Sequence, residues 1–277
     1  MEISILLAEQ ILAMFLTMAV GFGVVRGGLF KTEDSRIISN MVVYICNPCV
    51  VVHSFQIELT DDKIKGLMIA IGLSVVVHMV LIIGSEILSF IFHFNSIEKA
   101  SIIYTNAGYL VIPLVGAVLG EEWVFYTTAF ILVQTVLMWT HGVKLIGQEK
   151  DLNIRKILCN PNVIAMIIGI ALFALEIRLP TVVDSCVSGF GDMISPASMM
   201  VIGMVIGDVD LKWVFRQKRP YLICLLRLIV FPLIAVVAFT GLERSGIHPD
   251  AEYILMIVLI ATSAPAAAMI TQLAQIY

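Results

Sequence analysis

Long apolar stretches separated by short polar connections run along the whole chain. Each stretch has about the twenty residues that an α-helix needs to cross the apolar core of a membrane. The pattern predicts an all-α polytopic membrane protein with nine spans, at about 3–25, 36–56, 66–92, 98–119, 123–146, 162–178, 183–207, 220–242 and 251–274. The connections are too short to contain a soluble domain.

Two prolines interrupt the fourth and ninth predicted spans, and both belong to a longer repeat. Pro113 and Pro265 lie 152 residues apart. The same offset carries Ala13 onto Ala165, Met14 onto Met166, Ala19 onto Ala171 and Arg26 onto Arg178. A constant offset indicates an internal duplication. A proline inside a membrane helix frees backbone groups that only protein or water can satisfy, so paired interruptions predict a transporter's binding site.

The duplication divides the chain into a first repeat at 1–147, with five spans, and a second at 158–277, with four. Because five is an odd number, the second repeat is expected to be inverted relative to the membrane. The partner of the fifth span is expected to follow Tyr277, which would place the end of this sequence one helix before the end of the complete protein. A native nine-span protein with unequal halves is the alternative.

Composition and the placement of charge favour a multi-pass protein of the cell (cytoplasmic) membrane. Hydrophobic residues make up 60% of the chain and charged residues 14%, far from the averages of soluble proteins. Lysine and arginine are more frequent in the connections that lie inside when the N-terminus is outside, which predicts that orientation. The five cysteines fall mostly in apolar segments. Neither a disulfide framework, a metal site nor a cofactor is therefore expected.

Several short motifs carry a resemblance to a known family. The fourth span reads Asn106-Ala-Gly108-Tyr-Leu-Val-Ile-Pro113, and further motifs are Asn160-Pro161-Asn162, Asp192 followed by Gly203, and Ala264-Pro265. In order and spacing they resemble the auxin efflux carrier family, which includes plant PIN proteins and bacterial permeases for malate or malonate. The resemblance covers essentially the whole chain. Members of that family have ten helices, one more than the spans predicted here.

The resemblance implies two inverted five-helix repeats whose helices four and nine unwind and cross near the middle of the membrane. It also implies a scaffold from spans 1, 2, 6 and 7, a transport domain from spans 3–5 and 8–9, and elevator-like alternating access. The implied partners are a small carboxylate substrate, the lipid bilayer and a second copy in a homodimer, with proton or sodium coupling left open. No nucleic-acid partner is expected.

The candidate substrate-binding residues gather around the two interruptions. A helix that restarts at a break presents free N–H groups and the positive end of its dipole, which favours an anion. Asn106 is the first candidate because its amide can donate to a carboxylate, although satisfying the broken helix is its alternative role. The others are Thr105, Gly108, Pro113, Ser263, Pro265 and Asn47. For the hydroxyls, local backbone contacts are an equal alternative, whereas for Asn47, in the second predicted span, a structural cap on the kink at Pro48 is favoured over a contact with the ligand.

Arg227 is the clearly intramembrane arginine of the sequence. Glu86 lies at a similar predicted depth, so an ion pair between them is favoured over a grip on substrate by Arg227. Asp192, His78 and His53 are candidates for a proton relay, with hydrogen-bonded packing as the alternative. Gln134 and Gln272 either coordinate a ligand or bridge helices.

These observations predict a secondary transporter of small organic anions, either mono- or dicarboxylates. An anion channel and a membrane receptor that binds an organic acid without moving it are the alternatives. An enzyme ranks last, because no catalytic residues with a convincing context are present.

Overall fold

The computed structural model describes residues 2–147, 158–243, 248–267 and 270. Helices make up nearly all of these residues, and the described part of the chain has no β-strand beyond one isolated bridge. Helices long and apolar enough to cross a membrane occupy Thr32–Ser54, Asp61–Phe92, Glu121–Gly147, Thr181–Gly207 and Lys218–Gly241. Shorter apolar helices lie at Ile11–Arg26, Pro161–Ala174 and Ala251–Ser263. The prediction of an all-α membrane protein is thus confirmed, while the number of spans and the inverted repeats remain predictions.

The chain forms two compact units, each built from three separate segments. Unit 1 comprises Met1–Glu58, Gly108–Val124 and Ile164–Lys218. Unit 2 comprises Leu59–Ala107, Phe125–Val163 and Arg219–Tyr277. The chain therefore passes from unit 2 to unit 1 between Ala107 and Gly108, within the fourth predicted span. The assignment of scaffold and transport roles remains a prediction.

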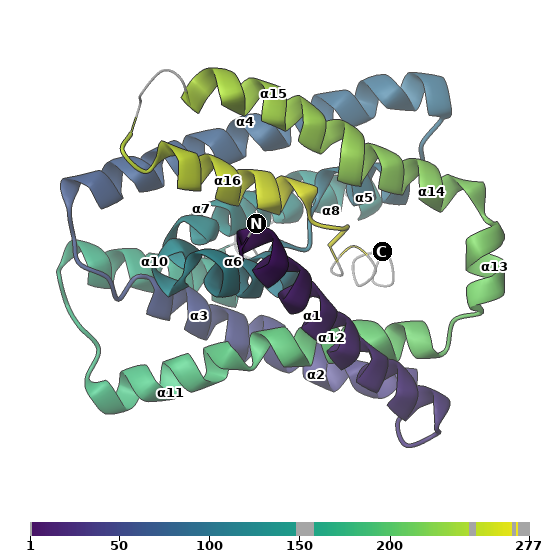
Figure 1. Cartoon of the computed structure of the whole chain (residues 1–277), viewed down its shortest axis with the longest axis horizontal. Helices are drawn as coiled ribbons and strands as arrows, with labels where there is room; N and C mark the ends of the chain where they lie inside the picture. The colour runs from purple at the N-terminus through teal and green to yellow at the C-terminus, as the bar shows by residue number, and fades with distance from the viewer. Residues whose placement is uncertain (1, 148–157, 244–247, 268–269, 271–277) are drawn as a thin grey trace. The chain divides into compact units, whose positions relative to one another are not determined.

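In unit 1, α1 (Glu2–Arg26) packs along α12 (Ile194–Gly207), as Figure 1 shows. Two glycines bring these helices close together. A side chain at Gly203 would overlap the backbone of Met18, and a side chain at Gly21 would overlap the backbone of Met200. Small residues allow this approach between membrane helices, where van der Waals packing supplies much of the attraction.

Further helix contacts of unit 1 involve α2, α3, α6 and α11. Close packing joins α3 to α11, and α12 also contacts α2. Their bounds are α2 Ser35–Met41, α3 Asn47–Ser54, α6 Ile112–Leu119, α11 Thr181–Asp192 and α13 Leu211–Arg216. The helix α10 (Pro161–Ala174) begins in unit 2 and continues into unit 1. Its start carries an Asn cap, because Asn160 Oδ1 accepts the backbone N–H of Asn162 at 2.9 Å.

Unit 2 is built on the longest helix, α4 (Asp61–Phe92). Figure 1 shows α15 and α16 lying beside it. The helix α5 packs against both α4 and α8. The bounds are α5 Ser96–Ile103, α7 Glu121–Leu137, α8 Val143–Gly147, α14 Lys218–Leu225, α15 Phe231–Glu243 and α16 Ala251–Ser263.

Wide π-helical turns precede three of the prolines. The segments η2 (Val42–Cys46), η3 (Ala107–Val111) and η5 (Leu226–Val230) each lead into an α-helix whose second residue is proline: Pro48, Pro113 and Pro232, respectively. A fourth π-helical segment, η4 (Met138–Gly142), leads into α8, which contains no proline. Proline lacks an N–H and clashes with the carbonyl one turn earlier, and a widened turn accommodates both effects without ending the helix.

This pattern corrects the expectation for Pro113. The chain is helical from Ala107 to Leu119, so Pro113 lies inside a helical segment and not at a break. The interruption of the fourth span instead lies at Tyr104–Asn106, where the backbone leaves the helical conformation. Pro265 does lie in a non-helical segment, directly after α16.

Candidate functional site

The two interruptions meet within unit 2. The helix α5 ends at Ile103 and α16 at Ser263, and the residues that follow pair through an antiparallel bridge between Thr105 and Ala266. The backbone N–H of Asn106 donates to the Pro265 carbonyl at 2.8 Å. The N–H of Ala267 donates to the Tyr104 carbonyl at 3.0 Å. Each broken helix thus satisfies part of the other's freed backbone, as an apolar surrounding requires.

Gln134, from α7, satisfies the middle residue of the first interruption. Its Oε1 accepts the backbone N–H of Thr105 at 2.8 Å and the Thr105 hydroxyl at 3.0 Å. Its Nε2 donates to the Thr105 carbonyl at 2.8 Å. The bridging alternative for Gln134 is therefore confirmed, whereas Gln272 lies outside the described residues.

Arg227 binds the C-terminal ends of both broken helices. It lies in η5 and is only 2% exposed. Its Nε donates to the Ala264 carbonyl at 3.1 Å, and its Nη1 donates to the Ile102 carbonyl. These carbonyls lie where each helix carries the negative end of its dipole, so the guanidinium satisfies them in both hydrogen bonding and charge. Its Nη2 is buried without a hydrogen-bond partner among the residues described.

The predicted ion pair between Glu86 and Arg227 is wrong. Glu86 pairs with Lys99 of α5, with 2.7 Å between Nζ and Oε2. Glu98, the residue before Lys99, accepts a hydrogen bond from Arg219 at 3.0 Å. Glu86 and Glu98 are thus paired with a lysine and an arginine other than Arg227. Arg227 binds two neutral carbonyls instead.

The predicted residues of unit 2 fall into two groups. Thr105 and the hydroxyl of Ser263 are occupied, since Ser263 Oγ donates to the Leu259 carbonyl at 2.8 Å. Asn106 is only 6% exposed, and its side-chain amide hydrogen-bonds to no residue in the described chain. Pro265, by contrast, is exposed. Asn106 and Pro265 are therefore the predicted residues at this break whose side chains remain available to a ligand.

Two of the candidates in unit 1, Asn47 and Gly108, lie against each other. A Cβ atom added to Gly108 would lie 3.1 Å from Asn47 Nδ2, so the glycine leaves room for the amide. The Oδ1 of Asn47 is buried and has no hydrogen-bond partner in the described residues. An unpaired buried acceptor is costly, which makes it a candidate for binding a donor group. Gly108 follows Asn106 after a single residue.

The candidates for proton binding are divided between the two units, with His78 in unit 2 and His53 and Asp192 in unit 1. In unit 2, His78 is fully buried, packs on the Phe130 ring and hydrogen-bonds through Nδ1 to the Ser74 carbonyl at 2.7 Å. In unit 1, His53 Nδ1 lies 2.9 Å from Asp184 Oδ1, and Asp192 is exposed at the end of α11. A role in proton transfer remains a prediction for each.

Sequence reasoning missed one contact at the break. Tyr104, the first residue after α5, has its hydroxyl 2.8 Å from His141 Nδ1 and 3.0 Å from the Leu137 carbonyl. His141 lies 37 residues from Tyr104 near the end of the fifth predicted span, so no local pattern links them. The available signal was that His141, a titratable residue, lies in the same apolar span as Gln134.

Comparison with known proteins agrees with this architecture. The profile of a family described as membrane transport proteins matches residues 6–156 and 148–277, which together cover nearly the entire chain. No curated protein sequence matches the chain. Two broken helices joined through buried polar side chains suit a membrane transporter, because irregular backbone at membrane depth occurs where it lines a protein or aqueous cavity. The chain belongs to the membrane transport protein family, which includes auxin efflux carrier, PIN-like and malate-permease-like members.

Proposed function

We propose that this membrane transporter moves small organic anions, and that the break in unit 2 holds their carboxylate. The observation that carries the proposal is the buried guanidinium of Arg227, whose partners in the described chain are two neutral carbonyls. A buried cation with no acidic partner makes the potential at the break more positive than the two helix ends alone would make it.

The sign of that potential depends on Arg227. Each C-terminal helix end carries the equivalent of about half a negative charge, so the ends of α5 and α16 together amount to about −1. The guanidinium offsets this charge. The segment that restarts at Ala107 then adds the positive end of its own dipole. Without Arg227 the break would favour a cation, and with it the break favours an anion.

Asn106 supplies the directional contact. Asn106 is the residue between Thr105 of the bridge and the helical segment that begins at Ala107, and its side-chain amide can donate to a carboxylate oxygen. Asn47 would add a second amide if transport brings it to the ligand. The cycle itself would follow an elevator-like movement of one unit, in a homodimer in the cell membrane with the N-terminus outside.

Binding measurements on the purified protein test the proposal. Isothermal titration with malonate, malate, succinate and acetate is compared with titration by succinamide, which has the same size and no charge. Asn106→Ala is expected to weaken carboxylate binding by about 10- to 100-fold, because losing one buried contact costs about 1–3 kcal/mol and each 1.4 kcal/mol is tenfold. Asn106→Asp is expected to bind more weakly still, since it places a negative charge beside the anion.

Arg227→Met is expected to abolish carboxylate binding, and Arg227→Lys to retain part of it because the charge remains. Arg219→Met is the matched control: it removes an arginine of the same unit that pairs with Glu98 at the surface, and it should bind normally. Wild-type affinity in Asn106→Ala and Arg227→Met together would exclude this site. Conductance without saturating uptake in proteoliposomes would indicate the channel instead.

A further inference from the structure

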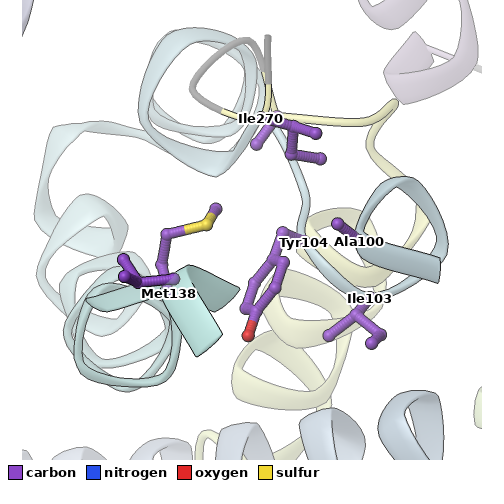
Figure 2. Close-up of a cluster of buried hydrophobic side chains, with 7 residues drawn as sticks. Ala100, Ile103, Tyr104, Met138 and Ile270 are labelled. Atoms are coloured by element: carbon purple, nitrogen blue, oxygen red, sulfur yellow. The ribbon is translucent and has the colours of Figure 1, made fainter. Parts of the chain in front are cut away.

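Tyr104 connects the first interruption to Leu137 and His141, which lie in another segment of unit 2. Its backbone carbonyl accepts the N–H of Ala267 from the second interruption. Its ring is fully buried in a cluster with Ala100, Ile103 and Met138, and Figure 2 shows it lying between Met138 and the two α5 residues. Because the ring belongs to the first residue of the interruption, a change in the contacts of the ring acts on the interruption itself.

The Tyr104 hydroxyl contacts two groups but can donate only one hydrogen. It lies 3.0 Å from the Leu137 carbonyl, which can only accept, and 2.8 Å from Nδ1 of His141. Both contacts are hydrogen bonds only when Nδ1 carries a proton, because the hydroxyl then accepts from His141 and donates to Leu137. A protonated imidazole always meets this condition, whereas a neutral one meets it in only one of its two tautomers.

The surroundings of His141 suit a group that gains and loses a proton. It is half-buried in the π-helical turn η4, and such turns recur at functional sites. The next residue, Gly142, leaves space for the Tyr104 ring, since a Cβ there would lie 3.2 Å from the ring. Two charged groups act on His141 from the neighbouring helices, Glu86 of α4 and Lys99 of α5, and they pair with each other. Lys144, on the following turn of its own segment, is exposed.

We propose that His141 is a proton-binding site whose protonation is transmitted through Tyr104 to the interrupted helices, and that this proton is the coupling ion of transport. The coupling part rests on the anion transport proposed above. Protonation completes both contacts of the Tyr104 hydroxyl and so holds the first interruption in place. Deprotonation releases one contact whenever the proton resides on Nε2. A proton carried with a monocarboxylate, or with the singly protonated form of a dicarboxylate, would make the step electrically neutral.

Hydrogen–deuterium exchange of the wild-type protein in nanodiscs tests the proton site without any substrate. The amides of Asn106 and Ala267, which form the bridge, are followed at pH 5.5 and 7.5 after correction for the intrinsic pH dependence of exchange. Their corrected exchange is expected to be about fivefold slower at pH 5.5, the change that corresponds to about 1 kcal/mol for one hydrogen bond.

His141→Gln and Tyr104→Phe are each expected to abolish this pH dependence, the first by removing the titrating group and the second by removing the link. His248→Gln is the matched control. It replaces a histidine of the same unit that hydrogen-bonds to the Asp62 carbonyl, and it should keep the wild-type response. A response that survives in both His141→Gln and Tyr104→Phe, or one that is absent from the wild type, would overturn the proton site.

Uptake of radiolabelled malate into proteoliposomes tests the coupling. With pH 5.5 outside and 7.5 inside, the wild type is expected to take up malate at least fivefold faster than without a gradient, and His141→Gln is expected to show equal rates. Equal rates in the wild type would refute coupling through a proton. If wild-type protein takes up no malate at all, the proposed substrate is refuted, and the exchange measurement still decides whether His141 controls the break.

Discussion

The contact between α1 and α12 in unit 1 and the paired interruptions of unit 2 solve the same problem in opposite ways. Both join helices in an apolar medium, where burying apolar surface gives little advantage over lipid. The first joins them by removing side chains, at Gly21 and Gly203, so that backbones meet. The second joins them by adding donors and acceptors, through Gln134 and Arg227.

The difference bears on which region can change during transport. A contact made by steric fit at glycine has no substitute partner and responds to neither charge nor ligand. The hydrogen bonds of the break can be exchanged for bonds to water or to a substrate, because their partners are polar and few. We therefore expect the glycine contact to govern stability and the break to govern function.

The largest expected effect is at the glycine contact. Gly203→Ala places a methyl group on the backbone of Met18 and is expected to destabilise the protein by about 3 kcal/mol, the upper end of the usual cost of overpacking. Gly189→Ala is the control, since a Cβ at that exposed helical position meets no atom. It should be neutral or stabilise by about 0.5–1 kcal/mol. Unfolding by sodium dodecyl sulfate in mixed micelles measures both, and equal stabilities would contradict the steric account.

A smaller effect is expected at the break. Gln134→Leu leaves the buried N–H and carbonyl of Thr105 without their partner and is expected to cost about 2 kcal/mol. Because the loss is local, the amide exchange of Thr105 should accelerate by about 30-fold. Thr128→Val, on the same helix, removes a hydroxyl whose partner in the described chain is the Phe125 carbonyl one turn earlier, and it should change little. If the two variants exchange alike, Gln134 does not hold the interruption.

The smallest effect is expected at Glu86. Its partner is Lys99, and its own side chain is 47% exposed, so Glu86→Gln should cost less than about 1 kcal/mol. Because Glu86 does not contact Arg227, the effects of Glu86→Gln and Arg227→Met should add within about 0.5 kcal/mol in a double-mutant cycle. A coupling of several kcal/mol in mixed-micelle unfolding would restore the pair expected from the sequence.

The sequence predicted the helices better than the break between them. Runs such as Asp61–Phe92 and Thr181–Gly207 follow from apolar length alone, which is a local property. The position of the interruption is not local. Pro113 drew the expectation because proline is unfavourable inside a helix, but the π-helical segment before it provides a widened turn that accommodates the proline without ending the helix.

The actual interruption at Tyr104–Asn106 depends on Gln134 and Arg227, which reach it from helices far along the chain. Asn106 could be named from its own residue type and neighbours. The partner of Arg227 could not, because equal depth in the membrane does not fix which way two helices face. The sequence predicts a similar depth for Glu86 and Arg227, yet each turns to another partner.

The π-helical turns also alter how the helical wheel of this protein should be drawn. Each such turn contains one residue more than an α-helical turn, and one residue corresponds to about 100° of rotation. The helix 218–243 therefore consists of two α-helical parts joined by the π-helical turn Leu226–Val230. A single helical wheel drawn over all its residues would place the side chains after the turn on the wrong face. Deleting one residue from such a turn would leave a regular α-helical turn, so the later side chains would keep their faces, but Pro232 would lose the widened turn that accommodates it.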